Sequence, residues 1–358
     1  METLSLVIPC YNEEQTLRNC IERCLKLQSE SLKLELIIVD DCSTDNSVKI
    51  ARELEAEYAP VRLLCQPVNM GKGAALRLGF SQANGDYVGI QDADSEYNPE
   101  DYLKLLVPMR EGKAEVVYGS RYLNQEMRRV LYFWHTLMNR GLTFISNMFT
   151  NLDITDMETC YKLFTRKAIR QIVPLLKENR FGFEPEVTEL VARLQFSVYE
   201  CAIHYQPRTY QEGKKIGWKD GVRALYCIMH YGAPYAPLPM QILIYFFIGV
   251  VCAIANIVIF SVLDFCGLSL LGAVAIAFLI AAALNYLLCL AILFRHKARW
   301  SGFGEICAYI ITVGLMGLLD WACTSGFVSL GMTAIWAKSW STLIGFIGNF
   351  LLRKYYVF

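Results

Sequence analysis

The chain has 358 residues, 54% of them apolar, and its 34 lysines and arginines balance 34 aspartates and glutamates. This even charge, without a long basic stretch, argues against a nucleic-acid-binding protein. The thirteen cysteines are scattered and form no C-x-x-C pair or zinc-like spacing, so we expect neither a disulfide framework nor a zinc site.

The apolar residues are concentrated at one end of the chain. Residues 1 to about 237 have a mixed, globular composition, whereas 240–358 consist of long apolar runs with few charges. A helix needs about 20 apolar residues to cross a bilayer, so this pattern predicts a cytosolic domain followed by a membrane domain. Because a strand pattern already begins at residue 4, we expect no signal peptide and reduced thiols.

The first part of the chain alternates short apolar runs with amphipathic stretches. We expect strands at 4–8, 34–39, 61–65, 87–90 and 115–118. We expect helices between them that reach to about residues 27, 58 and 84, and another that begins near Pro99. This order predicts an α/β domain with a mostly parallel sheet, whose ligand lies beyond the carboxyl ends of the strands.

Three carboxylates, Asp92, Asp94 and Glu96, follow the apolar run 87–90 within five residues. Hard cations take oxygen ligands, and Mg²⁺ commonly binds through one or two carboxylates together with substrate phosphates. The segment therefore predicts an Mg²⁺ or Mn²⁺ site for a diphosphate-bearing substrate. The alternative is a solvated acidic turn before the next helix.

The segment Gly71-Lys72-Gly73 places a lysine between two glycines. It is not a Walker loop, because Gln66 and Gly73 stand where that motif needs glycine and serine or threonine. The dinucleotide fingerprint fails as well, since its third glycine is Leu76. A helix N-terminus here could contact a nucleotide, and a plain turn is the alternative.

Five motifs together, in this order and spacing, resemble glycosyltransferase family 2. They are Pro9-x-Tyr11-Asn12-Glu13, Val39-Asp40-Asp41, Asn69-x-Gly71-Lys72-Gly73, Asp92-Ala93-Asp94 and Gly119-Ser120-Arg121-Tyr122. Within that family the chain is similar to the branch of dolichol-phosphate mannosyltransferases and polyprenyl-phosphate glucosyltransferases. The resemblance implies an A-type glycosyltransferase domain, which is Rossmann-like.

The resemblance also implies roles for particular residues. Those that would hold the base and ribose are Pro9, Tyr11, Glu13, Val39 and Asp41. Those that would place the metal and the sugar nucleotide are Asp92, Ala93 and Asp94, with Lys72 nearby. Glu96 stands where relatives often have a glutamine as a metal ligand, so the implied metal ligands are Asp92, Asp94 and Glu96.

In the expected reaction a hexose passes from one anion, the leaving nucleotide diphosphate, to another, the attacking lipid phosphate. Such a nucleophile needs no strong base, but it needs cations, for which we select Arg121, Arg208 and Lys215. Arg208 and Lys215 lie in a segment that resembles the family's phosphate-binding loop; a solvated charged loop is the alternative. The resemblance implies inversion at the anomeric carbon, with Asp94 touching the sugar or the metal. We assign Glu184 and Glu186 to the first turn of a helix.

The membrane half predicts four spanning helices, at 240–263, 268–293, 306–330 and 334–353. The basic stretches 295–299 and 353–354 should face the cytoplasm, which places the catalytic domain there as well. The half contains a repeat, since Asn285 to Phe294 and Asn349 to Phe358 share N-x₈-F with a shift of 64. It resembles a GtrA-like four-helix domain, and Asn285 and Asn349 are either packing features or hydrogen-bonding groups between helices.

These predictions give three regions and one preferred function. The regions are a cytoplasmic glycosyltransferase domain at 1–215, an interfacial amphipathic linker at 216–238 and an all-α four-helix transmembrane domain at 239–358. The function is inverting, metal-dependent transfer of one hexose from GDP-mannose or UDP-glucose to a polyprenyl or dolichyl phosphate. The protein is then an integral, multi-pass membrane protein, for which homo-oligomerisation is left open.

Three alternatives to this function stay open or are disfavoured. One is a transporter or flippase of lipid-linked sugars with a regulatory soluble domain, although the helices hold few charges, chiefly Asp264 and Asp320. Another is transfer to a different membrane acceptor. A processive polysaccharide synthase should carry Q-x-x-R-W, but His296 stands three residues before Arg299-Trp300.

Overall fold

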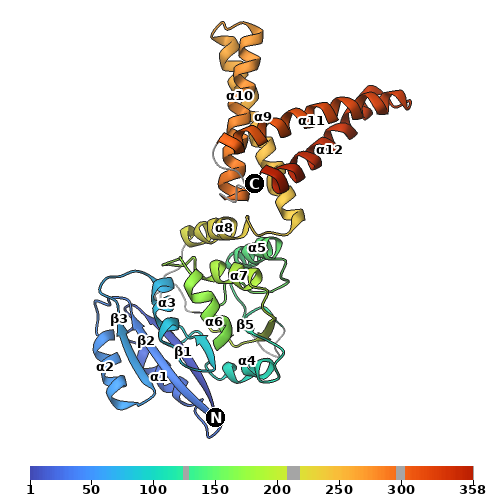
Figure 1. Ribbon diagram of the computed structural model, residues 1–358. Helices are drawn as coiled ribbons and strands as arrows, with labels where there is room; N and C mark the ends of the chain where they lie inside the picture. The colour runs from blue at the N-terminus through green and yellow to red at the C-terminus, as the bar shows by residue number, and fades with distance from the viewer. Residues whose placement is uncertain (124–128, 208–217, 296–302, 358) are drawn as a thin grey trace. The chain divides into compact units, whose positions relative to one another are not determined.

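The computed structural model describes residues 1–123, 129–207, 218–295 and 303–357 (Figure 1). Its contacts divide the chain into two compact units, Met1–Tyr235 and Ala236–Phe358. We describe each unit by itself.

The first unit is built on a seven-stranded sheet in the order β3-β2-β1-β4-β6-β5-β7. The strands are β1 (Glu2–Cys10), β2 (Leu32–Asp40), β3 (Val61–Cys65), β4 (Tyr87–Ile90), β5 (Val116–Ser120), β6 (Lys162–Thr165) and β7 (Val198–Ala202). β6 runs antiparallel to both of its neighbours, and all other pairs are parallel. The predicted mostly parallel α/β domain is confirmed.

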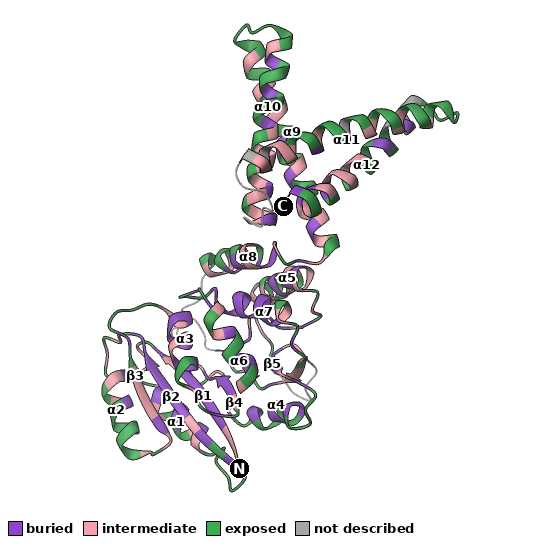
Figure 2. Cartoon of the chain, in the orientation of Figure 1, coloured by how far each residue is buried: buried purple, intermediate pink, exposed green. Residues whose placement is uncertain are grey.

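Helices cover both faces of this sheet. They are α1 (Leu17–Leu25), α2 (Ser47–Glu57), α3 (Lys72–Gln82), α4 (Asp101–Arg110), α5 (Phe133–Thr150), α6 (Arg166–Ile172), α7 (Phe183–Arg193) and α8 (Trp218–Gly232), with a 3₁₀ turn at Val173–Leu175. Consecutive residues of β1, Leu6, Val7 and Ile8, have no exposed surface, as expected for a strand covered on both sides (Figure 2). Because both faces of such a strand are covered, its residues form a continuous apolar run in the sequence.

The strand directions gather the loops that carry the sequence motifs at one edge of the sheet. β1, β2, β4 and β5 point the same way, so their carboxyl ends share that edge. Because β6 runs in the opposite direction, the segment before Lys162 arrives at the same edge. This edge is the site described below.

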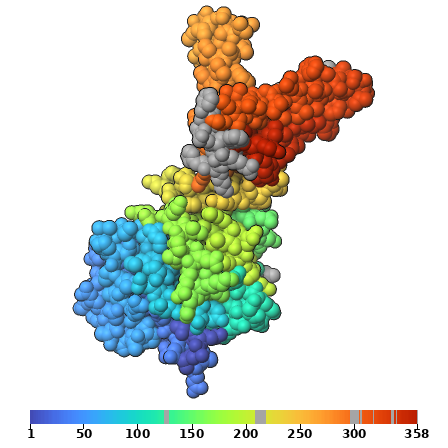
Figure 3. All heavy atoms as spheres, viewed as in Figure 1, coloured from blue at the N-terminus to red at the C-terminus, as the bar shows by residue number. Residues whose placement is uncertain are grey.

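α8 packs against α5 and α7 and belongs to the first unit (Figures 1 and 3). One of its faces exposes apolar side chains, those of Trp218, Val222, Tyr226 and Met229. Arg223 ties the helix to Glu178 through an ion pair of 2.8 Å. Within the region assigned to an interfacial linker, 216–238, the structure thus has an amphipathic helix; residues 216 and 217 lie outside the described part.

The second unit consists of two helical hairpins, α9 with α10 and α11 with α12 (Figure 1). The helices are α9 (Leu238–Phe265), α10 (Leu270–Leu288), α11 (Phe303–Ser329) and α12 (Ala334–Leu352), and π-helical turns follow α10 (Cys289–Phe294) and α12 (Arg353–Val357). All four predicted helices are present. In the described residues, three segments are long and apolar enough to cross a membrane: Leu238–Phe265, Leu270–Phe294 and Cys307–Ser329.

Candidate active site

The loops after β1 and β2 hold each other through hydrogen bonds. Asn12 adopts a left-handed conformation (φ 55°), its backbone N–H donates to Ser43 Oγ at 3.0 Å, and its Oδ1 accepts from the Thr44 N–H at 2.8 Å. The Glu13 N–H donates to Ser47 Oγ at 2.9 Å. These contacts fix the position of two of the five family motifs relative to each other.

Asp41 fixes the glycine loop that leads into α3. Its two carboxylate oxygens accept the backbone N–H groups of Met70 and Gly71, both at 2.7 Å, and Asn69 Nδ2 donates to its carbonyl oxygen at 3.1 Å. Asp41 is buried, so a nucleotide would meet a loop that this carboxylate has already shaped. The predicted role of Asp41 in holding the base or ribose stays a prediction.

Two buried polar atoms at this edge have no hydrogen-bond partner among the described residues. They are Asp40 Oδ1, at the end of β2, and Gln66 Nε2, directly after β3. The backbone N–H of Gln66 donates to the Asp40 carbonyl oxygen at 2.8 Å, so the two residues are neighbours. One free acceptor and one free donor can pair with the edge of a nucleobase. Our sequence reasoning gave neither residue a role, although Asp40 stands in a quoted motif.

Lys72, the first residue of α3, lies between two carboxylates. Its Nζ is 3.0 Å from Asp92 Oδ1 and 3.0 Å from Glu184 Oε1. Burial alone lowers the pKa of Lys72, but the charges of Asp92 and Glu184 offset it and hold this pKa well above its usual value. Lys72 is therefore a fixed positive charge beside the acidic loop. Glu184 lies in the first turn of α7 as predicted, but its ion pair with Lys72 was missed.

The acidic loop directs its three carboxylates to different partners. Asp92 binds Lys72, Asp94 Oδ1 accepts the Glu96 N–H at 3.1 Å, and Glu96 Oε2 accepts the hydroxyl of Tyr205 at 2.8 Å. Among the residues that the structure describes, no three metal-ligating side chains are grouped to hold an ion. A pair of carboxylate oxygen donors with substrate phosphates nevertheless suits Mg²⁺ or Mn²⁺, so Asp92 and Asp94 are chemically suited to one. The metal ligands stay a prediction.

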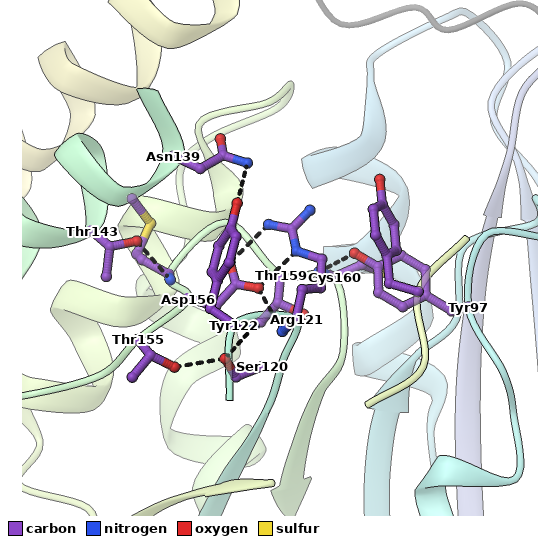
Figure 4. Close-up of polar contacts among 12 residues, drawn as sticks. Tyr97, Ser120, Arg121, Tyr122, Asn139, Thr143, Thr155, Asp156, Thr159 and Cys160 are labelled. Carbon is purple, nitrogen blue, oxygen red and sulfur yellow. Dashed lines mark hydrogen bonds and ion pairs between the residues drawn. The ribbon is translucent and has the colours of Figure 1, made fainter. Parts of the chain in front are cut away.

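Arg121 is bound by Asp156 in a bidentate ion pair (Figure 4). Arg121 Nε and one of its terminal nitrogens each donate to an Asp156 oxygen at 2.7 Å, and the Arg121 N–H donates at 3.0 Å. Both side chains are buried, and the guanidinium lies 5.1 Å from the centre of the Tyr205 ring. Arg121 thus anchors the segment before β6, and its predicted contact with a phosphate stays untested.

That segment carries a half-buried acid, Glu158, and β6 begins with a buried base, Lys162. Lys162 donates to the carbonyl oxygens of Met157, at 2.9 Å, and Thr159, and burial lowers the pKa of Lys162 to about 8. Burial, reinforced by the nearby Glu184 carboxylate, raises the pKa of Glu158 to about 7. Glu158 Oε1 has no partner among the described residues. These two groups are sensitive to pH near neutrality.

The remaining predicted residues differ in accessibility. Tyr11 is 40% exposed and Pro9 and Glu13 are half-buried, so all three can meet a ligand. Val39 has no exposed surface and packs toward Gly79 of α3, so only its backbone could touch a base. The predicted residue Ala93, at the centre of the acidic motif, is also buried. Arg208 and Lys215 lie outside the described residues.

Comparisons with known proteins support the resemblance drawn from the motifs. The family model "Glycosyl transferase family 2" matches residues 5–173, and the model "GtrA/DPMS, transmembrane domain" matches 244–358. The dolichyl-phosphate beta-glucosyltransferase of Drosophila melanogaster is 30% identical over 243 residues, covering 63% of this chain and 74% of that protein. The Homo sapiens protein of the same name is 28% identical over 227 residues, covering 60% and 69%.

A solved structure shares the fold. Glucosyl-3-phosphoglycerate synthase from Mycobacterium tuberculosis, in complex with uridine-diphosphate, has a TM-score of 0.50 and 17% sequence identity. The match covers 64% of this chain and 80% of that one, which agrees with the A-type fold implied by the motifs.

Proposed function

We propose, since this chain belongs to glycosyltransferase family 2 and carries a GtrA/DPMS-type transmembrane domain, that it transfers one glucosyl residue from a nucleotide sugar to a polyprenyl phosphate. The observation that carries this proposal is the similarity to dolichyl-phosphate beta-glucosyltransferases, which spans 74% of the Drosophila protein. The sequence alone left GDP-mannose and UDP-glucose open. The names of the relatives favour glucose, so UDP-glucose is the donor that we propose.

The donor would lie along the carboxyl edge of the sheet. Asp40 Oδ1 and Gln66 Nε2 supply an acceptor and a donor for the base, since both are buried and unpaired among the described residues. The diphosphate would lie near Lys72 and the N-terminus of α3, where a helix favours anions. Asp92 and Asp94 would hold an Mg²⁺ or Mn²⁺ ion, which would neutralise charge on the leaving diphosphate.

The reaction would be a single displacement. An oxygen of the lipid phosphate attacks the anomeric carbon as the bond to the nucleotide diphosphate breaks, which inverts the configuration. A phosphate monoester, with a second pKa near ~6, is largely dianionic at neutral pH and needs no general base. The protein must therefore hold two anions together, for which Arg208 and Lys215 remain our candidates beside Lys72. The buried Arg121–Asp156 pair keeps the wall of this site rigid.

The acceptor requires that the first unit work at a membrane. α8 exposes apolar side chains along one face, including Trp218 and Tyr226, which suits a helix that lies in the bilayer interface. The three long apolar segments of the second unit anchor the chain in the bilayer. We place the catalytic unit on the cytoplasmic side, because Lys354, which is more accessible than Arg353, follows the last long helix; the other basic stretch, 296–299, lies outside the described residues.

Membranes that contain the full chain test this proposal directly. They are incubated with radiolabelled UDP-glucose or GDP-mannose, with and without added polyprenyl phosphate, and lipids are extracted. We expect label from UDP-glucose in a lipid that releases glucose in mild acid, in an amount that rises with added acceptor. Label from GDP-mannose alone would overturn the choice of sugar. Label in a lipid indifferent to polyprenyl phosphate would favour another acceptor, and no label from either donor would favour the transporter.

The metal is tested in the same assay. A chelator should abolish transfer, and added Mg²⁺ or Mn²⁺ should restore it, because the acidic loop offers oxygen ligands only. Transfer that persists at full rate after dialysis against chelator would contradict a metal at Asp92 and Asp94.

A further inference from the structure

The second unit has an open cavity of about 560 Å³ lined by all four of its long helices. Most of the lining is apolar, but a group of polar side chains also faces it. They include Tyr245, Asn285, Tyr309, Asp320, Asn349 and Arg353. The two hairpins meet near the chain's C-terminus, where Arg353 lies, and diverge from there (Figure 1).

Arg353 is the buried cation of this cavity, with only 4% of its surface exposed. Its Nε donates to Asn349 Oδ1 at 3.0 Å, one terminal nitrogen donates to Asn285 Oδ1, and the other donates to the Tyr309 hydroxyl at 3.3 Å. The guanidinium also lies over two rings, 4.6 Å from the centre of Tyr309 and 5.7 Å from that of Tyr245. Four residues from four helices thus orient one charge.

All of these partners are neutral. The hydrogen-bond partners of Arg353 in the described part of the chain are uncharged, although a buried arginine ordinarily has an anionic partner. Asp320, a carboxylate that also lines the cavity, accepts a hydrogen bond from Ser341 at 2.8 Å. An arginine at a helix end can reach the aqueous interface instead, but such a side chain would be exposed. The neighbouring Lys354 is the more accessible of the two. The site therefore orients a buried positive charge with neutral groups, and an anion bound in the cavity could pair with it.

The internal repeat shows how the site is assembled. A shift of 64 residues relates Tyr245 to Tyr309 and Asn285 to Asn349, so the two hairpins contribute equivalent side chains. In each hairpin a π-helical turn begins four residues after the asparagine, a feature often found at functional sites. The symmetry is broken at one position, where Cys289 stands in the first repeat and Arg353 in the second. Two symmetric pairs therefore surround a single cation.

We propose that this cavity binds the phosphate headgroup of a membrane lipid, with Arg353 as the cation that pairs with the phosphate. Arginine suits this ligand because its planar fork can donate two hydrogen bonds to a phosphate. The apolar remainder of the lining, for example Phe278 and Phe346, can accept the start of the lipid chain. That the lipid is polyprenyl phosphate or its glucosylated product rests on the proposed function; the presence of a phosphate site does not.

Photo-crosslinking distinguishes lipid bound in this cavity from lipid bound in the active site. The full chain is purified in detergent, labelled with a photoreactive polyprenyl phosphate, and the adducts are located by peptide mass spectrometry. We expect adducts in α9–α12 that Arg353→Gln reduces at least tenfold, while adducts in the first unit persist. Lys354→Gln is the matched control and should leave them unchanged. Equal labelling of α9–α12 in wild type and Arg353→Gln would overturn the proposal.

Competition identifies the ligand class. Unlabelled polyprenyl phosphate, a phosphatidic acid or both should displace the probe from α9–α12, whereas a polyprenol without phosphate should not. Displacement by inorganic phosphate at the same concentration as by the lipids would overturn the assignment to a lipid. If Arg353→Gln does not fold, Asn285→Ala keeps the cation but removes one orienting acceptor, and it should reduce labelling severalfold. A chain that makes these adducts but transfers no sugar would retain this site while refuting the proposed function.

Discussion

Lys72 supplies a positive charge between two carboxylates of the candidate active site, because its Nζ lies 3.0 Å from both Asp92 and Glu184. Lys72→Met would leave these two carboxylates facing each other and remove a cation near the expected diphosphate. We expect glucosyl transfer to fall by about 100-fold or more, the typical cost of losing one preorganised charge contact. Initial rates measured on folded protein check this.

The control for this substitution is Lys104→Met, which breaks a Lys–Asp ion pair of 2.9 Å whose lysine is 55% exposed. Asp101 is buried, but it keeps the backbone N–H of His204 as a donor at 2.6 Å when the exposed lysine is removed, and Lys104 lies on α4. Its transfer rate should stay within about twofold of wild type. Equal losses in both variants would mean that Lys72 has no special role in the reaction.

Glu158 makes stability depend on pH. Its folded-state pKa is raised to about 7 from 4.5, so the folded state binds this proton more tightly than the unfolded state. The stabilising contribution is complete below about pH 4.5 and is lost as the pH rises through about 7. Glu158→Gln should therefore flatten the fall in melting temperature between pH 5 and pH 7, measured in detergent. Glu53→Gln, at an exposed site, should not alter that slope. An unchanged slope in Glu158→Gln would contradict the assignment.

At the scale of elements, the loop between β3 and α3 depends on one glycine. Gly71 has φ 98°, and a Cβ placed there would lie 2.5 Å from the carbonyl oxygen of Asn179. Gly112 also has positive φ, 68°, but a Cβ there would meet nothing within 4 Å. Comparing substitutions at these two glycines therefore distinguishes the effect of backbone strain from that of steric collision.

Gly71→Ala should displace the loop that Asp41 holds, and with it Lys72. We expect the KM for the sugar nucleotide to rise at least severalfold, together with a larger loss of stability than in Gly112→Ala. The latter carries only the strain of a left-handed residue, about 1–2 kcal/mol. Steady-state kinetics and thermal unfolding of both variants check this, and identical behaviour would show that the loop tolerates a side chain.

Local sequence patterns predicted the strands that are marked by a short apolar run. The runs at 4–8, 34–39, 61–65 and 87–90 fall in β1 to β4, and the run at 115–118 overlaps β5. β6 and β7 were not predicted: β6 has only two apolar residues, Leu163 and Phe164, and no residue of β7 is fully buried. Both are strands because they pair with β5. Strand ends correctly indicated where the motifs gather. The partners of those motifs were not predictable, because ion pairs such as Lys72–Glu184 join residues far apart in the chain.

The proposed topology requires the two ends of α9 to lie on opposite sides of a membrane. Cys42 and Cys65 are exposed in the first unit, and Cys266 is exposed directly after α9. α9 has 28 residues, enough to cross a bilayer once. Accessible cysteines can therefore report on the side of the membrane.

A membrane-impermeant maleimide applied to intact cells should label Cys266 and leave Cys42 and Cys65 unlabelled. Opening the membrane should allow all three to react, as read by peptide mass spectrometry. Cys266→Ser should remove the label from intact cells. Labelling of Cys42 without opening the membrane would contradict the cytoplasmic placement of the first unit.

Purified wild type and Asp92→Asn are compared in detergent for transfer from labelled UDP-glucose to polyprenyl phosphate, which tests the proposed reaction itself. Asp92 lies in the acidic loop and forms an ion pair with Lys72. We expect an acid-labile glucosyl lipid from wild type and at least about 100-fold less from Asp92→Asn at equal stability. Equal product from both proteins, or no glucosyl lipid from folded wild type, would contradict it.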